Sequence, residues 1–207
     1  SSVLWAASLI MPLSVAVMVA MVAMLLTTGA FHEDGLADFA DGFGAGYDKE
    51  NIMRIMKDSH IGTYGVITLA CSILLKFLLI SSLAQINVEI MDTLVIMVLA
   101  QSTSRFTPIV MLSTTPYVRS EKSKATHASR GISALSLIVA GIIAIAPLTL
   151  LGWKAMSLYL AIGSLLIIVF RAYTRRKIEG CTGDTLGALQ QIAEILFYIT
   201  IFAAYNL

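Results

Sequence analysis

The stretch TYGVITLACSILLKFLLISSLAQ, residues 63–85, carries a single charged residue, Lys76, in an otherwise apolar run. An α-helix of this length rises about 35 Å, enough to cross the roughly 30 Å hydrocarbon core of a bilayer. Further apolar runs lie near residues 10–29 and at 90–113, 132–152, 155–170 and 186–205. The sequence therefore predicts an all-α, polytopic membrane protein, a helical bundle of about six spans.

Composition supports a bilayer as the main solvent. The 207 residues are 57% hydrophobic and only 13% charged, with a formal net charge of +1. A balance so close to neutral excludes the basic excess with which proteins bind nucleic acid phosphates non-specifically. The two cysteines show neither disulfide nor zinc spacing, so we expect both thiols to be free. We expect one transmembrane catalytic domain, residues 1–207, in contact with lipid but not with nucleic acid.

The basic residues indicate the orientation of the chain. The short connection 86–89 has none, and residues 152–154 contain only Lys154. By the positive-inside rule the loops rich in Lys and Arg face the cytoplasm, as in a multi-pass protein of the cell inner membrane. The basic residues of those three loops, 30–62, 114–131 and 171–185, are Lys49, Arg54, Lys57, Arg119, Lys122, Lys124, Arg130, Arg171, Arg175, Arg176 and Lys177.

The first cytoplasmic loop contains an acidic cluster at the end of a span. Its sequence, FHEDGLADFADG at residues 31–42, contains four carboxylates. If the segment is helical, the i, i+4, i+7 spacing puts Asp34, Asp38 and Asp41 on one face. Carboxylates grouped in this way suit Mg²⁺, which prefers a few acidic ligands together with water and substrate phosphate. A solvated acidic face is the alternative interpretation.

A second segment of this loop predicts an amphipathic interfacial helix over residues 48–59, with Asp48 as its N-cap. Its polar face carries Arg54 and Lys57, which could contact lipid head groups or hold a phosphate. Asp58 beside them is either a further metal ligand or their ion-pair partner.

Charged residues inside the spans need partners, because an unpaired charge in hydrocarbon is costly. We expect an ion pair between Arg105 and Glu194, whereas Lys76 has no obvious partner in the sequence. Asp184, Gly187, Gln191 and Glu194 share one stripe of the last span, which should face the bundle. At the start of this span, the segment Gly180–Thr185 would offer free N–H groups to a phosphate, and Asp184 could also act as an N-cap.

Two motifs together resemble the cobalamin synthase family, the adenosylcobinamide-GDP ribazoletransferases. They are FHEDGLADFADGFG, residues 31–44, and RIMKDSHIGTYG, residues 54–65; GDTLGA, residues 183–188, is also similar. Members of this family usually have more residues before the position of Ser1, so we expect the chain to lack an N-terminal segment. The DxxDG element, residues 38–42, also occurs in CDP-alcohol phosphotransferases, but the rest of that signature is missing.

The resemblance implies transfer of a cobinamide phosphoryl group from adenosylcobinamide-GDP to α-ribazole or its 5′-phosphate, with release of GMP. It implies catalytic roles for Glu33, Asp34, Asp38 and Asp41, with Glu33, or with less support His32, as the base. The residues that we expect to hold Mg²⁺ are Asp34, Asp38, Asp41 and Asp58, and those that bind substrate phosphate are Arg54, Lys57, Gly183 and Asp184. The rival functions are a phospholipid-forming alcohol phosphotransferase and an ion-coupled transporter; whether the chain forms a homo-oligomer is left open.

Overall fold

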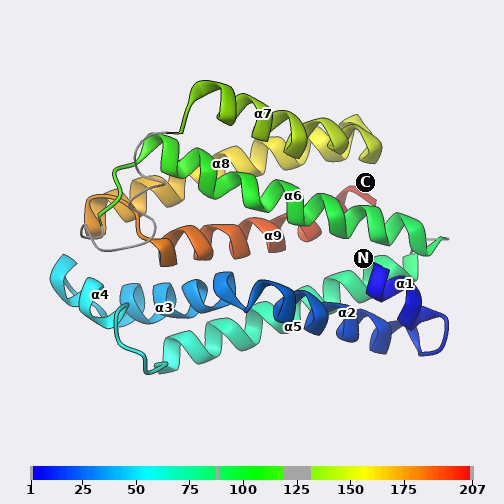
Figure 1. Ribbon diagram of the computed structural model, residues 1–207, viewed down its shortest axis with the longest axis horizontal. Helices are drawn as coiled ribbons and strands as arrows, with labels where there is room; N and C mark the ends of the chain where they lie inside the picture. Colours follow the sequence, from blue (N-terminus) through cyan, green and yellow to red (C-terminus); the bar gives the residue numbers. More distant parts are fainter. Residues whose placement is uncertain (1, 87–88, 119–131, 206–207) are drawn as a thin grey trace.

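The computed structural model describes residues 2–86, 89–118 and 132–205, and its regular secondary structure is helical throughout these ranges, as expected for an all-α protein. The four basic residues expected in loop 114–131 lie outside them. Figure 1 shows the helices in chain order. They are α1 (Ser2–Ser8), α2 (Leu13–Thr28), α3 (Phe31–Ala45), α4 (Lys49–Ile55), α5 (Thr63–Ile86), α6 (Ile90–Thr114), α7 (Ala134–Ile145), the 3₁₀ helix η3 (Ala146–Leu151), α8 (Trp153–Ile178) and α9 (Gly183–Tyr205).

Five helical segments are long and apolar enough to cross a membrane: α5, α6, α7 with η3, α8 and α9. A sixth span is counted only if α2 and α3, which meet at 85°, are taken together. Large apolar side chains such as Leu135, Ile138 and Leu165 point outward and are exposed. In a bilayer this surface contacts lipid, so the chain is a multi-pass membrane protein of five to six spans.

The junction between α2 and α3 differs from our expectation. Within the connection 30–62 we expected a helix over 48–59, which the structure has as the shorter α4; the chain also re-enters a helix at Phe31, directly after α2, and forms α3. Gly29 and Ala30 have φ values of 63° and 53°, so two left-handed residues in succession break the helix and change its direction. A left-handed residue with a Cβ costs about 1 kcal/mol, which the packing of α3 must offset.

Helix α9 is the centre of the bundle. It packs against α3, α5, α6 and α8, and its residues Ala188, Leu189, Phe197 and Tyr198 are fully buried. Figure 1 shows α9 between α3 and α5 on one side and α6 and α8 on the other. Helix α4 and the connection from α8 to α9 lie at the left end of this view, whereas both termini lie toward the right. The residues of α4 and of 171–185 are thus brought to one end of the bundle, and α3 runs from this end toward the middle.

Candidate active site

The acidic motif forms the helix α3, which packs between α5 and α9. Close contact with α9 depends on two glycines that face each other. A Cβ added to Gly35 would lie 3.1 Å from the carbonyl oxygen of Asp184 and 3.3 Å from the Cα of Gly187. These contacts hold the first turn of α9 against the middle of the acidic motif, so the predicted residue Asp184 lies beside α3.

The side chains of α3 divide between an inner and an outer side. Glu33, Leu36 and Ala37 are buried, whereas Asp34 is exposed and Asp38 is partly exposed. Asp34 and Asp38 are one helical turn apart, so their side chains lie on the same strip of the helix surface. Their accessibility means that a ligand approaching this end of the bundle can reach both carboxylates.

Asp41 has a different environment from the other two aspartates. Its Oδ2 accepts a 2.7 Å hydrogen bond from the N–H of Gly62, and its Oδ1 accepts a 2.8 Å bond from the N–H of Gly65. A Cβ on either glycine would overlap the carboxylate, so both glycines are needed for this approach. Buried Asp41 therefore binds the N-terminus of α5, where N–H groups lack helical partners and the helix dipole favours a negative charge.

The expected four metal ligands are not assembled in the described part of the chain. No group of three or more His, Cys, Asp or Glu side chains among residues 2–86, 89–118 and 132–205 is close enough to hold a metal ion. Asp58 is exposed and is hydrogen-bonded to His60, with 2.7 Å between Oδ1 and Nδ1, rather than to Arg54 or Lys57. Hydrogen bonds from the side chain and backbone of His60 lower the pKa of Asp58. Of the four expected ligands, Asp34 and Asp38 are the two that lie one turn apart on the accessible side of α3.

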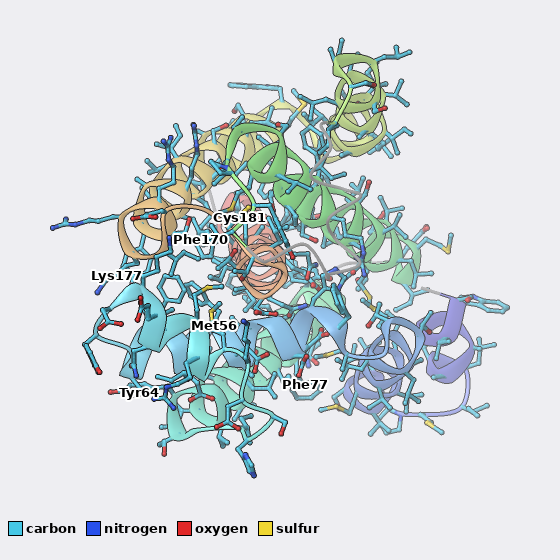
Figure 2. All side chains as sticks on the ribbon, turned by 60° about the vertical axis from the view of Figure 1, so that its left-hand side comes forward. Met56, Tyr64, Phe77, Phe170, Lys177 and Cys181 are labelled. Carbon is cyan, nitrogen blue, oxygen red and sulfur yellow. The ribbon has the colours of Figure 1, made fainter. Side chains whose placement is uncertain are left out.

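Helix α4 brings the candidate phosphate-binding residues to this end. Asp48 caps it as expected, accepting from the N–H of Asn51 at 2.8 Å. Its apolar side packs on protein: Ile52 and Met56 are buried against Phe43 of α3 and Ile178 of α8. Arg54 and Lys57 are exposed on the opposite side. Figure 2, which brings this end forward, shows Met56 on the inside and Lys177 at the periphery.

The start of α9 is capped in a different way from our expectation. Thr182 and Thr185 exchange hydrogen bonds, each N–H donating to the hydroxyl of the other, at 2.9 and 3.3 Å. The N–H of Cys181 donates to the carbonyl of Pro116 at 2.9 Å. The predicted row of free N–H groups over 180–185 is therefore wrong for Cys181, Thr182 and Thr185, and Thr182 takes the capping position that we considered for Asp184.

The charges inside the spans are paired differently from the prediction. Lys76 Nζ lies 3.6 Å from Glu33 Oε1 and 3.7 Å from Glu194 Oε2, so Lys76 is the ion-pair partner of both acids. Arg105 does not contact Glu194 directly. Its guanidinium donates to the carbonyl oxygen and the side-chain oxygen of Gln101, whose Nε2 donates to Glu194 Oε1 at 2.5 Å. The stripe of α9 faces the bundle as expected, since Gly187, Gln191 and Glu194 are buried.

Sequence reasoning missed the link between Lys76 and Glu33. A lone lysine in an apolar span indicates a buried counter-charge, but the sequence does not say which helix supplies it. His32 lies beside the cluster and is half-buried. It lines a small cavity together with Glu33, Lys76, Gln101, Arg105, Gln191 and Glu194.

Comparison with known proteins identifies the family. The sequence profile of the cobalamin-5-phosphate synthase family matches residues 1–202. The adenosylcobinamide-GDP ribazoletransferase of Shewanella frigidimarina is 41% identical over 204 residues, which cover 97% of this chain and 77% of that protein. The protein of the same name from Vibrio cholerae serotype O1 is 38% identical over 191 residues, 92% of this chain and 72% of that protein. No solved structure gives a significant match. The chain belongs to the cobalamin-5-phosphate synthase family.

Proposed function

We propose that this chain is an adenosylcobinamide-GDP ribazoletransferase. The observation that carries the proposal is its identity of about 40% over nearly its whole length to proteins of that name. In the reaction, a ribose hydroxyl of α-ribazole or its 5′-phosphate attacks the phosphorus that bears cobinamide. A phosphodiester bond forms, the diphosphate bond breaks, and GMP leaves. The hydroxyl proton passes to a base. The product is adenosylcobalamin or its 5′-phosphate.

The residues at the α3 end of the bundle suit this chemistry. Phosphoryl transfer requires positioning and neutralisation of the diphosphate charge more than covalent help from the protein. Asp34 and Asp38 are accessible, and positive charge is supplied by Arg54 on α4, the neighbouring helix, and by Lys57 in the turn that follows it. Asp184 borders the same region through its contact with Gly35 of α3, and Gly183 is the residue before it. In this assignment Asp41 and Asp58 support the backbone, while Asp34 and Asp38 act on the substrate.

Magnesium is the cofactor that we propose for this pair of aspartates. Mg²⁺ is commonly bound by one or two carboxylates plus substrate phosphates, and when bound it would neutralise charge on the diphosphate. Calorimetric titration of the purified protein with Mg²⁺ in the presence of GDP tests this separately from turnover. Binding should weaken in Asp34→Asn and in Asp38→Asn but not in Asp92→Asn, whose carboxylate is exposed at the start of α6.

Location and orientation are part of the proposal. The end that carries α4 and the α8–α9 connection holds Lys49, Arg54, Arg175, Arg176 and Lys177, so the positive-inside rule assigns it to the cytoplasm. A site on the cytoplasmic side would be open to water-soluble nucleotide substrates inside the cell. We propose the cell inner membrane as the location.

The experiment that tests the function is direct. Purified protein in lipid vesicles is incubated with adenosylcobinamide-GDP, α-ribazole and Mg²⁺, and GMP release is measured by chromatography. GMP should appear only when both organic substrates are present, in step with the cobalamin product. Replacing them with CDP-diacylglycerol and an alcohol tests the phospholipid synthase alternative, for which CMP release is the signal. CMP without GMP would overturn the proposal.

A further inference from the structure

A buried cluster of charges connects the inner side of α3 to the bundle. Lys76 of α5 lies between Glu33 of α3 and Glu194 of α9, and the exposed fractions of these side chains are 7%, 10% and 3%. Lys76 Nζ also donates a 2.7 Å hydrogen bond to Gln191 Oε1. One cation therefore joins three helices at one point.

The amide side chains extend this cluster by hydrogen bonds to both of its carboxylates. Gln191 Nε2 donates to Glu33 Oε1 at 2.9 Å, and Gln190 Nε2 donates to Glu194 Oε2 at 3.2 Å. Gln101 connects Glu194 to Arg105. Two basic side chains thus balance two acidic ones, as burial in a low-dielectric bundle requires.

Glu33 is poorly arranged to act as the general base. Its Oε1 already accepts from Gln191 and faces Lys76, and its side chain is buried. A base must come within about 3 Å of the proton that it removes. The adjoining cavity has a volume of about 30 Å³, which suits one or two water molecules but not a ribose. In this arrangement Glu33 therefore faces Lys76 and Gln191 inside the bundle.

We propose that Lys76, Glu33, Gln191 and Glu194 form a positioning device for the acidic helix. This inference rests on the proposed function. Lys76 attracts Glu33 toward α5 and α9 and so sets the rotation of α3 about its axis. Asp34 is the next residue and Asp38 follows one turn later, so a fixed Glu33 fixes both carboxylates at the outer surface. Glu33 and Lys76 act through α3 and do not touch the substrate.

Substitutions that change the net charge of the cluster and then restore it test this proposal. Lys76→Met leaves Glu33 and Glu194 facing each other with Arg105 as the one remaining cation of the cluster. Adding Glu33→Gln restores neutrality and retains a side-chain oxygen that can accept from Gln191. Lys154→Met is the matched control, because Lys154 is exposed at the start of α8, away from the cluster.

The test measures GMP release, its pH dependence and thermal unfolding in vesicles for four variants: Lys76→Met, Glu33→Gln, the double variant and Lys154→Met. Lys76→Met should lower kcat at least about tenfold and lower the unfolding temperature, with KM changed less than about threefold, because the loss concerns transition-state interactions. The double variant should recover most of the lost kcat and most of the lost unfolding temperature. Glu33→Gln should lower kcat by less than about tenfold and should keep the fall in rate at low pH that a catalytic base produces. Loss of a base instead lowers the rate about 10²–10⁴-fold. Lys154→Met should match the wild type.

Two results would overturn the inference. One is a folded Glu33→Gln variant whose kcat falls more than about 100-fold and whose rate no longer falls at low pH, which would make Glu33 the base. The other is a double variant no more active and no more stable than Lys76→Met, because coupled residues must depart from additivity. If the wild type releases no GMP, the proposed function fails, and the unfolding temperatures still decide whether the cluster is coupled.

Discussion

Asp41 shows how one carboxylate of the acidic motif is committed to folding. It accepts hydrogen bonds from Gly62 and Gly65 at the start of α5, at 2.7 and 2.8 Å. Asn has nearly the same shape but only one acceptor oxygen, so one backbone N–H would face an NH₂ group. Asp41→Asn should lower the free energy of unfolding by about 1–3 kcal/mol, the cost of an unsatisfied buried group.

Thermal unfolding in detergent measures this effect, with Asp92→Asn as the control for loss of an exposed carboxylate. An Asp41→Asn variant that unfolds at the wild-type temperature would show that these two hydrogen bonds contribute nothing to stability.

At the residue scale, the sequence showed which residues are chemically important but not which residues they contact. It indicated that Lys76, Arg105 and Glu194 needed partners, because charges in hydrocarbon are expensive. The actual pairs depend on how each helix is rotated about its axis. Arg105 meets Gln101 on its own helix, and Lys76 takes both Glu33 and Glu194. That rotation results from packing over the whole bundle, which a single sequence does not reveal.

At the scale of elements, α3 is the helix that the sequence described least well. Its four carboxylates between residues 33 and 41 lower the hydropathy of the segment, so a pattern based on apolar runs ends at the preceding span. The structure places the segment inside the bundle, where Glu33 Oε1 contacts Gln191 and Lys76 and Asp41 accepts from backbone N–H groups. The spacing argument placed Asp34, Asp38 and Asp41 on one face; it describes Asp34 and Asp38, which are accessible, but not Asp41, which is buried against the start of α5.

The contact between α3 and α9 gives a prediction at this scale. Gly35→Ala would bring a methyl group to 3.1 Å from the carbonyl oxygen of Asp184, which is a backbone atom and cannot rotate away. The two helices must separate, so stability should fall by about 1–3 kcal/mol and GMP release should fall with it. Gly163→Ala in α8 is the control, because its Cβ would meet nothing closer than 3.8 Å.

Unfolding temperature and GMP release are measured for both variants. A Gly35→Ala protein as stable and as active as Gly163→Ala would contradict the close approach of α3 and α9.

At the scale of the whole molecule, composition was enough to predict a multi-pass helical bundle, because length and apolar content decide whether a helix can span. The number of spans was less certain. The helix α2 has 16 residues and meets α3 at 85°, so its span is counted only together with α3. Two left-handed residues, Gly29 and Ala30, cause this break, and Ala30 carries no sequence signal for that conformation.

Orientation is tested on the same scale by single cysteines. Tyr47→Cys and Arg176→Cys place exposed thiols at the α4 end, and Trp153→Cys places one at the start of α8 at the opposite end. In intact cells, an impermeant maleimide should label the last variant but not the first two, because loops rich in Lys and Arg remain in the cytoplasm. Labelling of Tyr47→Cys or Arg176→Cys from outside would reverse the proposed topology.

The central claim is that the outward carboxylates of α3 carry the phosphoryl transfer. The most direct measurement is the rate of GMP release by Asp34→Asn and Asp38→Asn in vesicles, with unfolding temperature as the check on folding. Each variant should lose at least about 100-fold in kcat while unfolding close to the wild-type temperature, since each removes a charge that neutralises the diphosphate. Chelation of Mg²⁺ should silence the wild type. Rates near that of the wild type in both variants would contradict the account and leave α3 with a structural role alone.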